Sequence, residues 1–210
     1  HRVGHRLEGR IILSMAEPTP GIIAAEPLAD ARWLRLFRVY YRFADGADRS
    51  WVIATRNERP RCISGRFETP DAVIIVAYHR EISRIVVTRE YRVALSDYEY
   101  GFPAGLVEAG ESVEAAARRE LFEETGLKAT RVLQTSPCLY SSAGMTDESM
   151  VLVHVECEGE PSAAGNDASE LIEVLLLSPE EAGRLCGNPA LKFDAKAWLV
   201  LSSFAATGSI

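Results

Sequence analysis

A glycine-rich loop that runs directly into an acidic helix constrains this chain more than any other stretch. Residues 100–110 read YGFPAGLVEAG, and three glycines with a proline predict a loop. Residues 112–125 then show a 3.6-residue period, with Ser112 able to cap the start of a helix and Gly126 its end. The apolar side of this helix consists of Val113, Ala116, Ala117 and Leu121. A loop glycine beside such a helix lets the backbone approach it closely.

The polar side of the same helix gathers three carboxylates. Glu120, Glu123 and Glu124 are related by i,i+3 and i,i+4 spacing, so they share one face. Three carboxylates on one face repel each other unless a cation is present, and they are hard oxygen ligands suited to Mg²⁺ or Mn²⁺. The alternative interpretation is a solvated acidic face paired with Arg118 and Arg119.

The rest of the chain mixes strands and helices, which indicates an α/β or α+β fold. The run AVIIVA at residues 72–77 is continuously apolar, as expected for a central strand that is buried on both faces. We predict further strands at residues 33–41, 50–56, 85–88, 132–133, 150–156 and 173–177, and helices at residues 179–186 and 195–204.

Three regions are expected along the chain. The first 14 residues precede Met15, lack the apolar core of a signal peptide and are interpreted as an expression leader or extension. Residues 16–30 contain three prolines and predict a lead-in loop, so residues 1–30 form the first region. Residues 31–68 are expected to form a small β subdomain around an antiparallel hairpin, and residues 69–210 the main domain.

Composition excludes some classes of protein. The 23 Lys and Arg against 30 Asp and Glu give a formal charge of −7, which argues against a nucleic-acid partner. No apolar run approaches the roughly 20 residues of a membrane helix, so no membrane partner is expected. The four cysteines show no C-x-x-C spacing, and reduced thiols in a cytoplasmic protein are the simplest interpretation.

The acidic helix and its loop together match a known signature. Gly105, Glu111, the pair Arg119-Glu120, the pair Glu123-Glu124 and Gly126 resemble at every specified position the box of the Nudix hydrolases. The resemblance covers about residues 72–205. It implies an α/β/α sandwich with a mixed central sheet, and divalent-metal-dependent hydrolysis of a nucleoside diphosphate linked to another group.

The resemblance also implies roles for the residues of the box. Glu120 and Glu124 would bind Mg²⁺ or Mn²⁺, with Glu123 as a further ligand or a neighbour of the ligands. The carbonyl of Ala104, just before the box, would be another ligand. Structural roles in the box are implied for Gly105, Glu111, Arg119 and Gly126.

Residues before the box resemble the ADP-ribose and ADP-sugar pyrophosphatases. The motif Glu90-Tyr91-Arg92 and the stretch from Phe102 to Leu106 carry this resemblance. It implies that Arg92 contacts substrate phosphates, which suits the bidentate guanidinium, and that Leu106 belongs to the substrate site. The alternative is that Arg92 is an ordinary surface arginine.

Two tryptophans near the N-terminus extend the same resemblance. Trp33, Trp51 and Arg56 are spaced like the tryptophan pair and arginine of the ADP-sugar pyrophosphatases. The resemblance implies a homodimer with a swapped N-terminal hairpin, in which two indoles from different subunits sandwich the base. The alternative is that both indoles only pack in the core or in the dimer.

Three departures from the subfamily keep the substrate open. Ala143 stands where a substrate-class proline is found, Gly101 replaces a glutamate, and Val52 replaces a glutamate that contacts the base. ADP-ribose, hydrolysed to AMP and ribose 5-phosphate, is the first expectation. Hydrolysis of a UDP- or GDP-sugar and a non-catalytic nucleotide-binding module are the alternatives.

The general base is expected on an acidic loop before a late strand. Glu170 aligns with the second glutamate of the subfamily pattern, whereas Ala168 replaces the first. We therefore expect Glu170 to accept the proton, with Glu123 or Glu124 of the box as other catalytic candidates. Glu173 and Asp167 are further candidates for this role.

Overall fold

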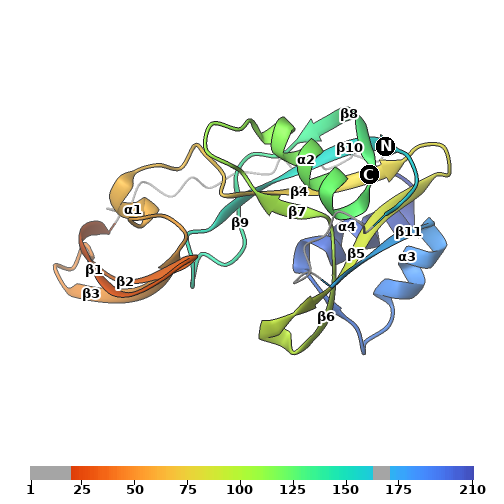
Figure 1. Cartoon of the computed structure of the whole chain (residues 1–210). Helices are drawn as coiled ribbons and strands as arrows, with labels where there is room; N and C mark the ends of the chain where they lie inside the picture. The colour runs from red at the N-terminus through yellow and green to blue at the C-terminus, as the bar shows by residue number, and fades with distance from the viewer. Residues whose placement is uncertain (1–19, 163–170) are drawn as a thin grey trace, which may run out of the picture. The chain divides into compact units, whose positions relative to one another are not determined.

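The computed structural model describes residues 20–162 and 171–210. Residue contacts divide the chain into two units. The N-terminal unit runs to Arg66 and also takes in Gly144–Asp147. The catalytic unit, named here for the acidic helix that it contains, consists of Phe67–Ala143 and Glu148–Ile210. Figure 1 labels the elements of both units.

In the N-terminal unit, the described residues form an antiparallel sheet in the order β1-β2-β3. Its strands are β1 (Gly21–Ala31), β2 (Leu34–Arg42) and β3 (Asp48–Thr55), and a one-turn helix, α1 (Arg61–Ser64), follows them. The predicted hairpin is confirmed as β2 and β3, which pair from Arg35 opposite Thr55 to Arg42 opposite Asp48.

The prediction of a loop over residues 16–30 is wrong for the described part of that range, because β1 begins at Gly21. Proline lacks a backbone N–H and is tolerated in a sheet mainly at an edge or a bulge. β1 is an edge strand of its sheet, and its register shifts between Pro27 and Ala29. Pro27 therefore marks an irregular edge strand here rather than a loop.

The far edge of β3 is paired with a segment from much later in the chain. The Ala54 N–H donates to the Met145 carbonyl at 2.8 Å, and the Asp147 N–H donates to the Ala54 carbonyl at 3.3 Å. A parallel bridge joins Ala54 and Thr146. These bonds explain why Gly144–Asp147 belongs to the N-terminal unit.

In the catalytic unit, the described residues form a mixed sheet. Its main strands are hydrogen-bonded to one another in the order β12-β6-β5-β4-β10-β8. Strand β11 pairs with β5, β7 with β4, and β9 with β10. The strands are β4 (Ala72–His79), β5 (Arg84–Arg92), β6 (Asp97–Gly101), β7 (Ala104–Leu106), β8 (Lys128–Thr135), β9 (Leu139–Tyr140), β10 (Ser149–Glu158), β11 (Ile172–Leu177) and β12 (Lys192–Phe193).

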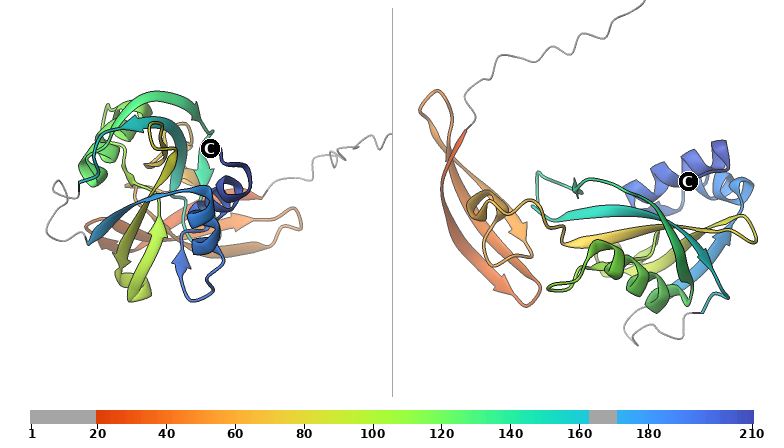
Figure 2. Two further views of the ribbon diagram at one scale, coloured as in Figure 1. Left: turned by 90° about the vertical axis from the view of Figure 1, so that its right-hand side faces the viewer. Right: turned by 90° about the horizontal axis from the view of Figure 1, so that it is seen from above.

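Helices cover both faces of this sheet, as the right-hand view of Figure 2 shows. They are α2 (Val113–Thr125) on one face and α3 (Pro179–Cys186) with α4 (Ala195–Thr207) on the other, and a short turn, η1 (Val93–Leu95), follows β5. Val73 and Ile75 of β4 pack in the core beneath α2, whereas Val76 packs in the core beneath α3 and α4. This alternation explains the continuous apolar run and confirms the predicted α/β/α sandwich.

The predicted loop at residues 100–110 is partly wrong, because it contains β7 and the last residues of β6. Ala104 pairs with Ile74, and the Ile75 N–H donates to the Pro103 carbonyl at 2.8 Å. Pairing with the central strand therefore orders a stretch that is locally rich in turn residues. Within the described ranges, no helix is long and apolar enough to cross a membrane.

Candidate functional site

Helix α2 supplies the acidic side of the candidate site. The Ser112 side chain accepts the Ala115 N–H at 3.2 Å, and Gly126 ends the helix in the left-handed region at φ 71°. Ala117 and Leu121 are fully buried against the sheet. The helix is thus anchored along its apolar side, as predicted, and its carboxylates lie on the opposite side.

The loop before the box lies directly against two of these carboxylates. A Cβ added to Gly105 would lie 1.8 Å from Cδ of Glu120, so no larger residue fits at this position. The Ala104 N–H donates to Oε2 of Glu124 at 3.2 Å. The backbone of residues 104–105 and the side chains of Glu120 and Glu124 therefore form one continuous polar surface.

Arg119 joins most of the acidic residues of the box. Its Nη1 contacts Oε1 of Glu120 at 2.7 Å and Oε2 of Glu123 at 3.2 Å. Its Nε and Nη2 bind the two oxygens of Glu111 at 3.0 and 2.9 Å, and Nη2 also donates to the Leu106 carbonyl at 3.0 Å. One guanidinium thus links the helix, the loop and β7.

The titration of these groups follows from their contacts. Burial raises the pKa of the Glu120 carboxyl, although the hydrogen bond from Arg119 acts in the opposite direction. Hydrogen bonds from Arg119, followed by one from the Glu108 N–H, lower the pKa of Glu111. The same pairing with Glu111 raises the pKa of Arg119. Glu120 is thus a partly buried carboxyl whose ionised form a nearby cation would stabilise.

The donor chemistry of this surface fits a hard divalent cation. Carboxylate oxygens on one helix face, with a backbone pressed against them at Gly105, are the ligand types that Mg²⁺ and Mn²⁺ prefer. Among the described residues, however, no three acidic, histidine or cysteine side chains already converge as a metal cage. Glu120 and Glu123 turn toward Arg119 instead, so a cation would have to draw them away from it.

Arg92 lies at the end of β5, within an ion-pair network. Its Nη1 contacts Oε1 of Glu90 at 2.7 Å, and its Nε contacts Oε2 of Glu99 at 3.4 Å. About half of the Arg92 side chain remains exposed. Leu106 is also partly exposed, and its carbonyl supports Arg119. Both are accessible to a ligand, and their predicted contacts with substrate stay predictions.

The N-terminal unit presents both tryptophans on its surface. Trp33 lies in the turn between β1 and β2 rather than in the predicted strand, and the guanidinium of Arg32 lies 4.5 Å from its ring centroid. Trp51 lies in β3, and its Nε1 donates to the Gly144 carbonyl at 2.8 Å. Arg56 follows β3, where its carbonyl accepts a hydrogen bond from Arg35. The two indoles are 64% and 55% exposed, so they are not core residues.

An open hollow of about 470 Å³ adjoins Trp51. Its lining is formed by Leu36, Ser50, Trp51, Val52, Ala54, Gly144 and Met145. Sequence reasoning missed Met145, because only the pairing of residues 144–147 with β3 brings it beside Trp51. The hollow can hold a flat, largely apolar group.

The predicted general base, Glu170, lies outside the described residues, and so do the further candidate Asp167 and the neighbouring Ala168. Glu173, the other further candidate, lies in β11, and its carboxylate pairs with Arg89 at 2.8 Å. Arg89 in turn lies 3.7 Å from the ring centroid of Tyr98. Glu173 is therefore engaged in a surface ion pair.

Comparisons with known proteins agree with this geometry. The profile of the NUDIX domain matches residues 68–199. The chain is 30% identical over 131 residues to an ADP-ribose pyrophosphatase of Saccharomyces cerevisiae, covering 62% of this chain and 55% of that protein. It is 30% identical over 158 residues to an ADP-sugar pyrophosphatase of Mus musculus, covering 71% of this chain and 67% of that protein.

A solved structure shows the same fold. The crystal structure of an ADP compounds hydrolase matches with a TM-score of 0.71 and 24% identity, over 92% of this chain and 97% of that one. The family profile spans well over half of the chain and includes the whole of the acidic helix. The chain therefore belongs to the Nudix hydrolase family.

Proposed function

We propose that this chain hydrolyses the pyrophosphate bond of a nucleoside diphosphate sugar with the help of a divalent metal. ADP-ribose is the first candidate, and AMP and ribose 5-phosphate are its products. The observation that carries the proposal is the acidic face of α2 with the Gly105 backbone pressed against Glu120. The names of the yeast and mouse relatives support the substrate class.

The residues that would hold the metal are Glu120, Glu123 and Glu124, with the Ala104 carbonyl beside them. Pyrophosphatases of this family generally need a divalent metal, and Mg²⁺ or Mn²⁺ suits this donor set. When bound, the ion would neutralise phosphate charge and make an attacking water more acidic. Glu111 and Arg119 would keep the helix and the loop in register through their paired hydrogen bonds.

The other roles belong to side chains that can meet the substrate. Arg92, and with it Arg56, would hold the diphosphate through paired hydrogen bonds. Glu170, or Glu123 or Glu124 of the box, would accept the proton of the attacking water. Trp33 and Trp51 would stack on the base, because both indoles are exposed in the N-terminal unit. In a homodimer with a swapped N-terminal hairpin, these indoles would come from different subunits.

The direct test is release of AMP from ADP-ribose with and without Mg²⁺ or Mn²⁺. Glu124→Gln keeps the size of the side chain but removes its charge, and we expect at least about a 100-fold loss of turnover. Glu114→Gln is the matched control, since Glu114 lies on the same helix but pairs with Arg118 rather than with the residues of the acidic site. Normal turnover by the Glu124→Gln protein would refute the metal site.

A second candidate substrate has its own structural support. Val52 lines the hollow beside Trp51, where the subfamily has a glutamate that contacts the base. An apolar residue there weakens selection for adenine, which favours a UDP- or GDP-sugar as the alternative. A substrate panel scored for phosphomonoester products distinguishes the two. Binding without metal-dependent turnover of any panel member would instead indicate a nucleotide-binding module.

The role of the indoles and the oligomeric state can be tested separately. Trp51→Ala should raise KM for the preferred nucleotide sugar much more than it lowers kcat, because stacking is lost while the acidic site stays intact. Sedimentation equilibrium gives the mass of the particle, and a monomer would contradict the swapped homodimer. Equal KM values for Trp51→Ala and the unchanged protein would contradict the stacking role.

A further inference from the structure

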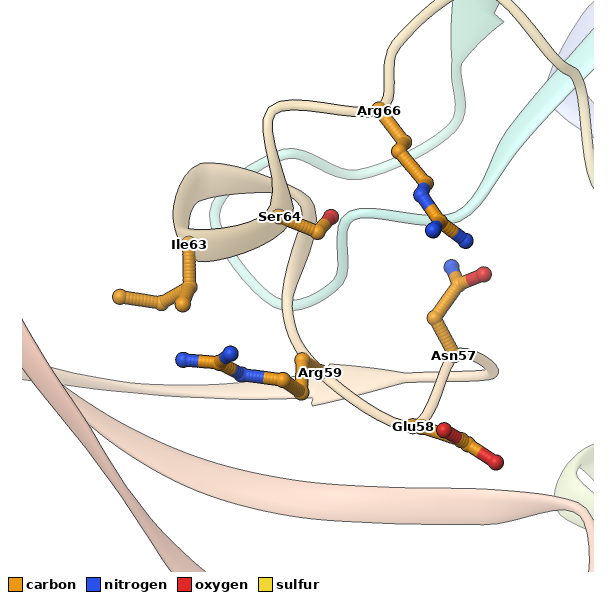
Figure 3. A pocket seen from close by; sticks show the side chains of 6 residues that line it. All are labelled: Asn57, Glu58, Arg59, Ile63, Ser64 and Arg66. Carbon is orange, nitrogen blue, oxygen red and sulfur yellow. The ribbon is translucent and has the colours of Figure 1, made fainter.

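A polar pocket in the N-terminal unit has no part in the proposed reaction. It has a volume of about 430 Å³, within the roughly 300–1,000 Å³ typical of small-molecule sites. Its lining, shown in Figure 3, consists of Asn57, Glu58, Arg59, Ile63, Ser64 and Arg66. We call it the arginine pocket.

The charge around the arginine pocket is opposite to that of the chain. The chain has a formal charge of −7, yet residues 56–66 contain four arginines and a single acidic residue, Glu58. Figure 3 shows the Glu58 carboxylate pointing away from the guanidinium of Arg59. This local excess of positive charge favours an anionic ligand.

The walls of the pocket are held by buried backbone contacts. The buried Arg61 donates from Nη1 to the Arg66 carbonyl at 2.6 Å. Gly65 adopts the left-handed region at φ 71°, and its N–H donates to the Arg61 carbonyl, so the chain turns back after α1. On the other wall, the Asn57 N–H donates to Oγ1 of the buried Thr55 at 3.1 Å. The positions of Asn57 and Arg66 are therefore fixed before any ligand arrives.

The side chains on these walls are mainly hydrogen-bond donors. In Figure 3 the guanidinium of Arg66 and the amide of Asn57 point toward one another, with the Ser64 hydroxyl on the same side. Arg59 extends along the other side, beneath Ile63. Within the described part of the chain, neither Arg59 nor Arg66 uses its guanidinium in an ion pair or hydrogen bond. Two planar donor forks thus remain for a ligand with several acceptor oxygens.

We propose that the arginine pocket binds the phosphate group of a small phosphate monoester. A doubly charged phosphate matches two guanidinium groups: its oxygens can accept paired hydrogen bonds from Arg66 on one side of the pocket, and Arg59 on the other side adds positive charge. The pocket is larger than a lone phosphate ion, so part of the organic group also enters. This inference needs neither the metal site nor turnover of any substrate.

The ligand can be tested by nuclear magnetic resonance on the full chain in EDTA, which removes divalent metal. The probes are inorganic phosphate, AMP and ribose 5-phosphate, with adenosine and ribose as uncharged counterparts. We expect saturable shifts of the backbone amides of residues 57–66 with the phosphorylated probes alone. Equal shifts with adenosine and AMP would overturn the proposal, because the base would then be recognised. Absence of shifts with all three phosphorylated probes would also overturn it.

A charge-matched pair of variants tests the residues. Arg59→Gln with Arg66→Gln should weaken AMP binding by at least about tenfold, because hydrogen bonds to a charged group are lost. Arg38→Gln with Arg49→Gln removes the same charge from exposed ion pairs outside the pocket and should change binding by less than about twofold. Equal losses in both double variants would show diffuse attraction and refute the site.

A third variant separates geometry from charge. Arg66→Lys keeps the positive charge but loses the planar fork, so binding should fall by several-fold without disappearing. This substitution is also mild enough to test the proposal if the double variant does not fold. Unchanged affinity in Arg66→Lys would contradict paired recognition of phosphate by Arg66.

Discussion

Arginines have opposite surroundings in the acidic site and in the arginine pocket. Arg119 contacts three carboxylates and a backbone carbonyl, so its positive charge is neutralised by groups of the protein itself. Arg59 and Arg66 have no such partner in the described part of the chain. The same side chain can therefore hold a site together or remain available for a ligand. The outcome depends on whether acceptors of the protein lie within reach of the guanidinium.

The two regions should therefore respond differently to substitution. Loss of a group in the acidic site removes support from the fold as well as from the chemistry, because Glu111, Glu120 and Glu123 share the guanidinium of Arg119. Loss of a guanidinium in the arginine pocket should affect ligand binding alone. Five experiments test this contrast.

The largest effect is expected for Gly105→Ala. The new Cβ would lie 1.8 Å from Glu120 Cδ, so the loop or the helix must shift. Misplacing catalytic groups by about 1 Å can cost about 100-fold in rate, and we expect at least that loss in hydrolysis of the preferred nucleotide sugar. Gly101→Ala is the control, because its Cβ would lie an ordinary 3.7 Å from Thr88 Oγ1. Equal activity of the two variants would contradict the close approach.

Arg119→Ala should lower the free energy of unfolding by about 1–3 kcal/mol, since it leaves Glu111 and Glu120 without their shared donor. Mg²⁺ should raise Tm more in this variant than in the unchanged protein, because the ion can replace the lost charge. Urea unfolding and thermal melts measure both effects. Arg118→Ala loses a partly exposed pair with Glu114 and a hydrogen bond to the Ala129 carbonyl, and it should cost less than Arg119→Ala. Similar losses of stability in both variants would contradict the larger structural role of Arg119.

A smaller effect is expected for the pH dependence of metal affinity. Burial raises the folded-state pKa of Glu120 above its unfolded value, so its contribution favours folding at low pH and is lost as pH rises through the raised pKa. Metal binding needs the ionised form, and apparent metal affinity should fall as pH decreases through that same raised pKa. Calorimetric titration with Mg²⁺ from about pH 8 to about pH 5 measures this fall. An affinity that stays constant over this whole pH range would contradict it.

The contribution of Glu111 to stability should depend on pH in the opposite direction. Its pKa is lowered by Arg119, so its stabilising contribution is present above the ordinary glutamate pKa and is lost as pH falls through the lowered value. Comparison of Glu111→Gln with the unchanged protein in acid unfolding isolates that contribution. A difference between them that grows as pH falls would contradict the assignment.

The smallest effect is expected for stability in the double variant Arg59→Gln with Arg66→Gln. Neither guanidinium supports the fold through a hydrogen bond in the described residues, so unfolding free energy should change by less than about 0.5 kcal/mol. Urea unfolding provides the measurement. A loss above about 1 kcal/mol would show that both regions use their arginines structurally, and the contrast would fail.

Local patterns predicted the parts of the structure that depend on local interactions. The period and caps of α2 placed its carboxylates on one face, and AVIIVA identified the central strand. The edge strand β1 was missed, because Pro27 is tolerated in it only through its place at a sheet edge. The position of Met145 was missed, because it depends on pairing with a strand about 90 residues earlier.

The candidate site shows the same division. Spacing placed the three glutamates of α2 on one face, the resemblance to the Nudix box added Gly105, Glu111 and Arg119, and the structure brings them together. Sequence spacing could not show that one guanidinium serves several carboxylates, because that depends on side-chain reach across the loop. The arginine pocket could not be found either, since Arg59 and Arg66 line one pocket only after Gly65 turns the chain back.

The pairing of Gly144–Asp147 with β3 has a consequence for the engineering of this chain. The smaller unit is built from two separate stretches of the chain, so its transfer to another protein requires both stretches. A graft of residues 20–66 onto another protein would leave the far side of β3 without its native partner. Chimaeras between relatives should therefore exchange both stretches together.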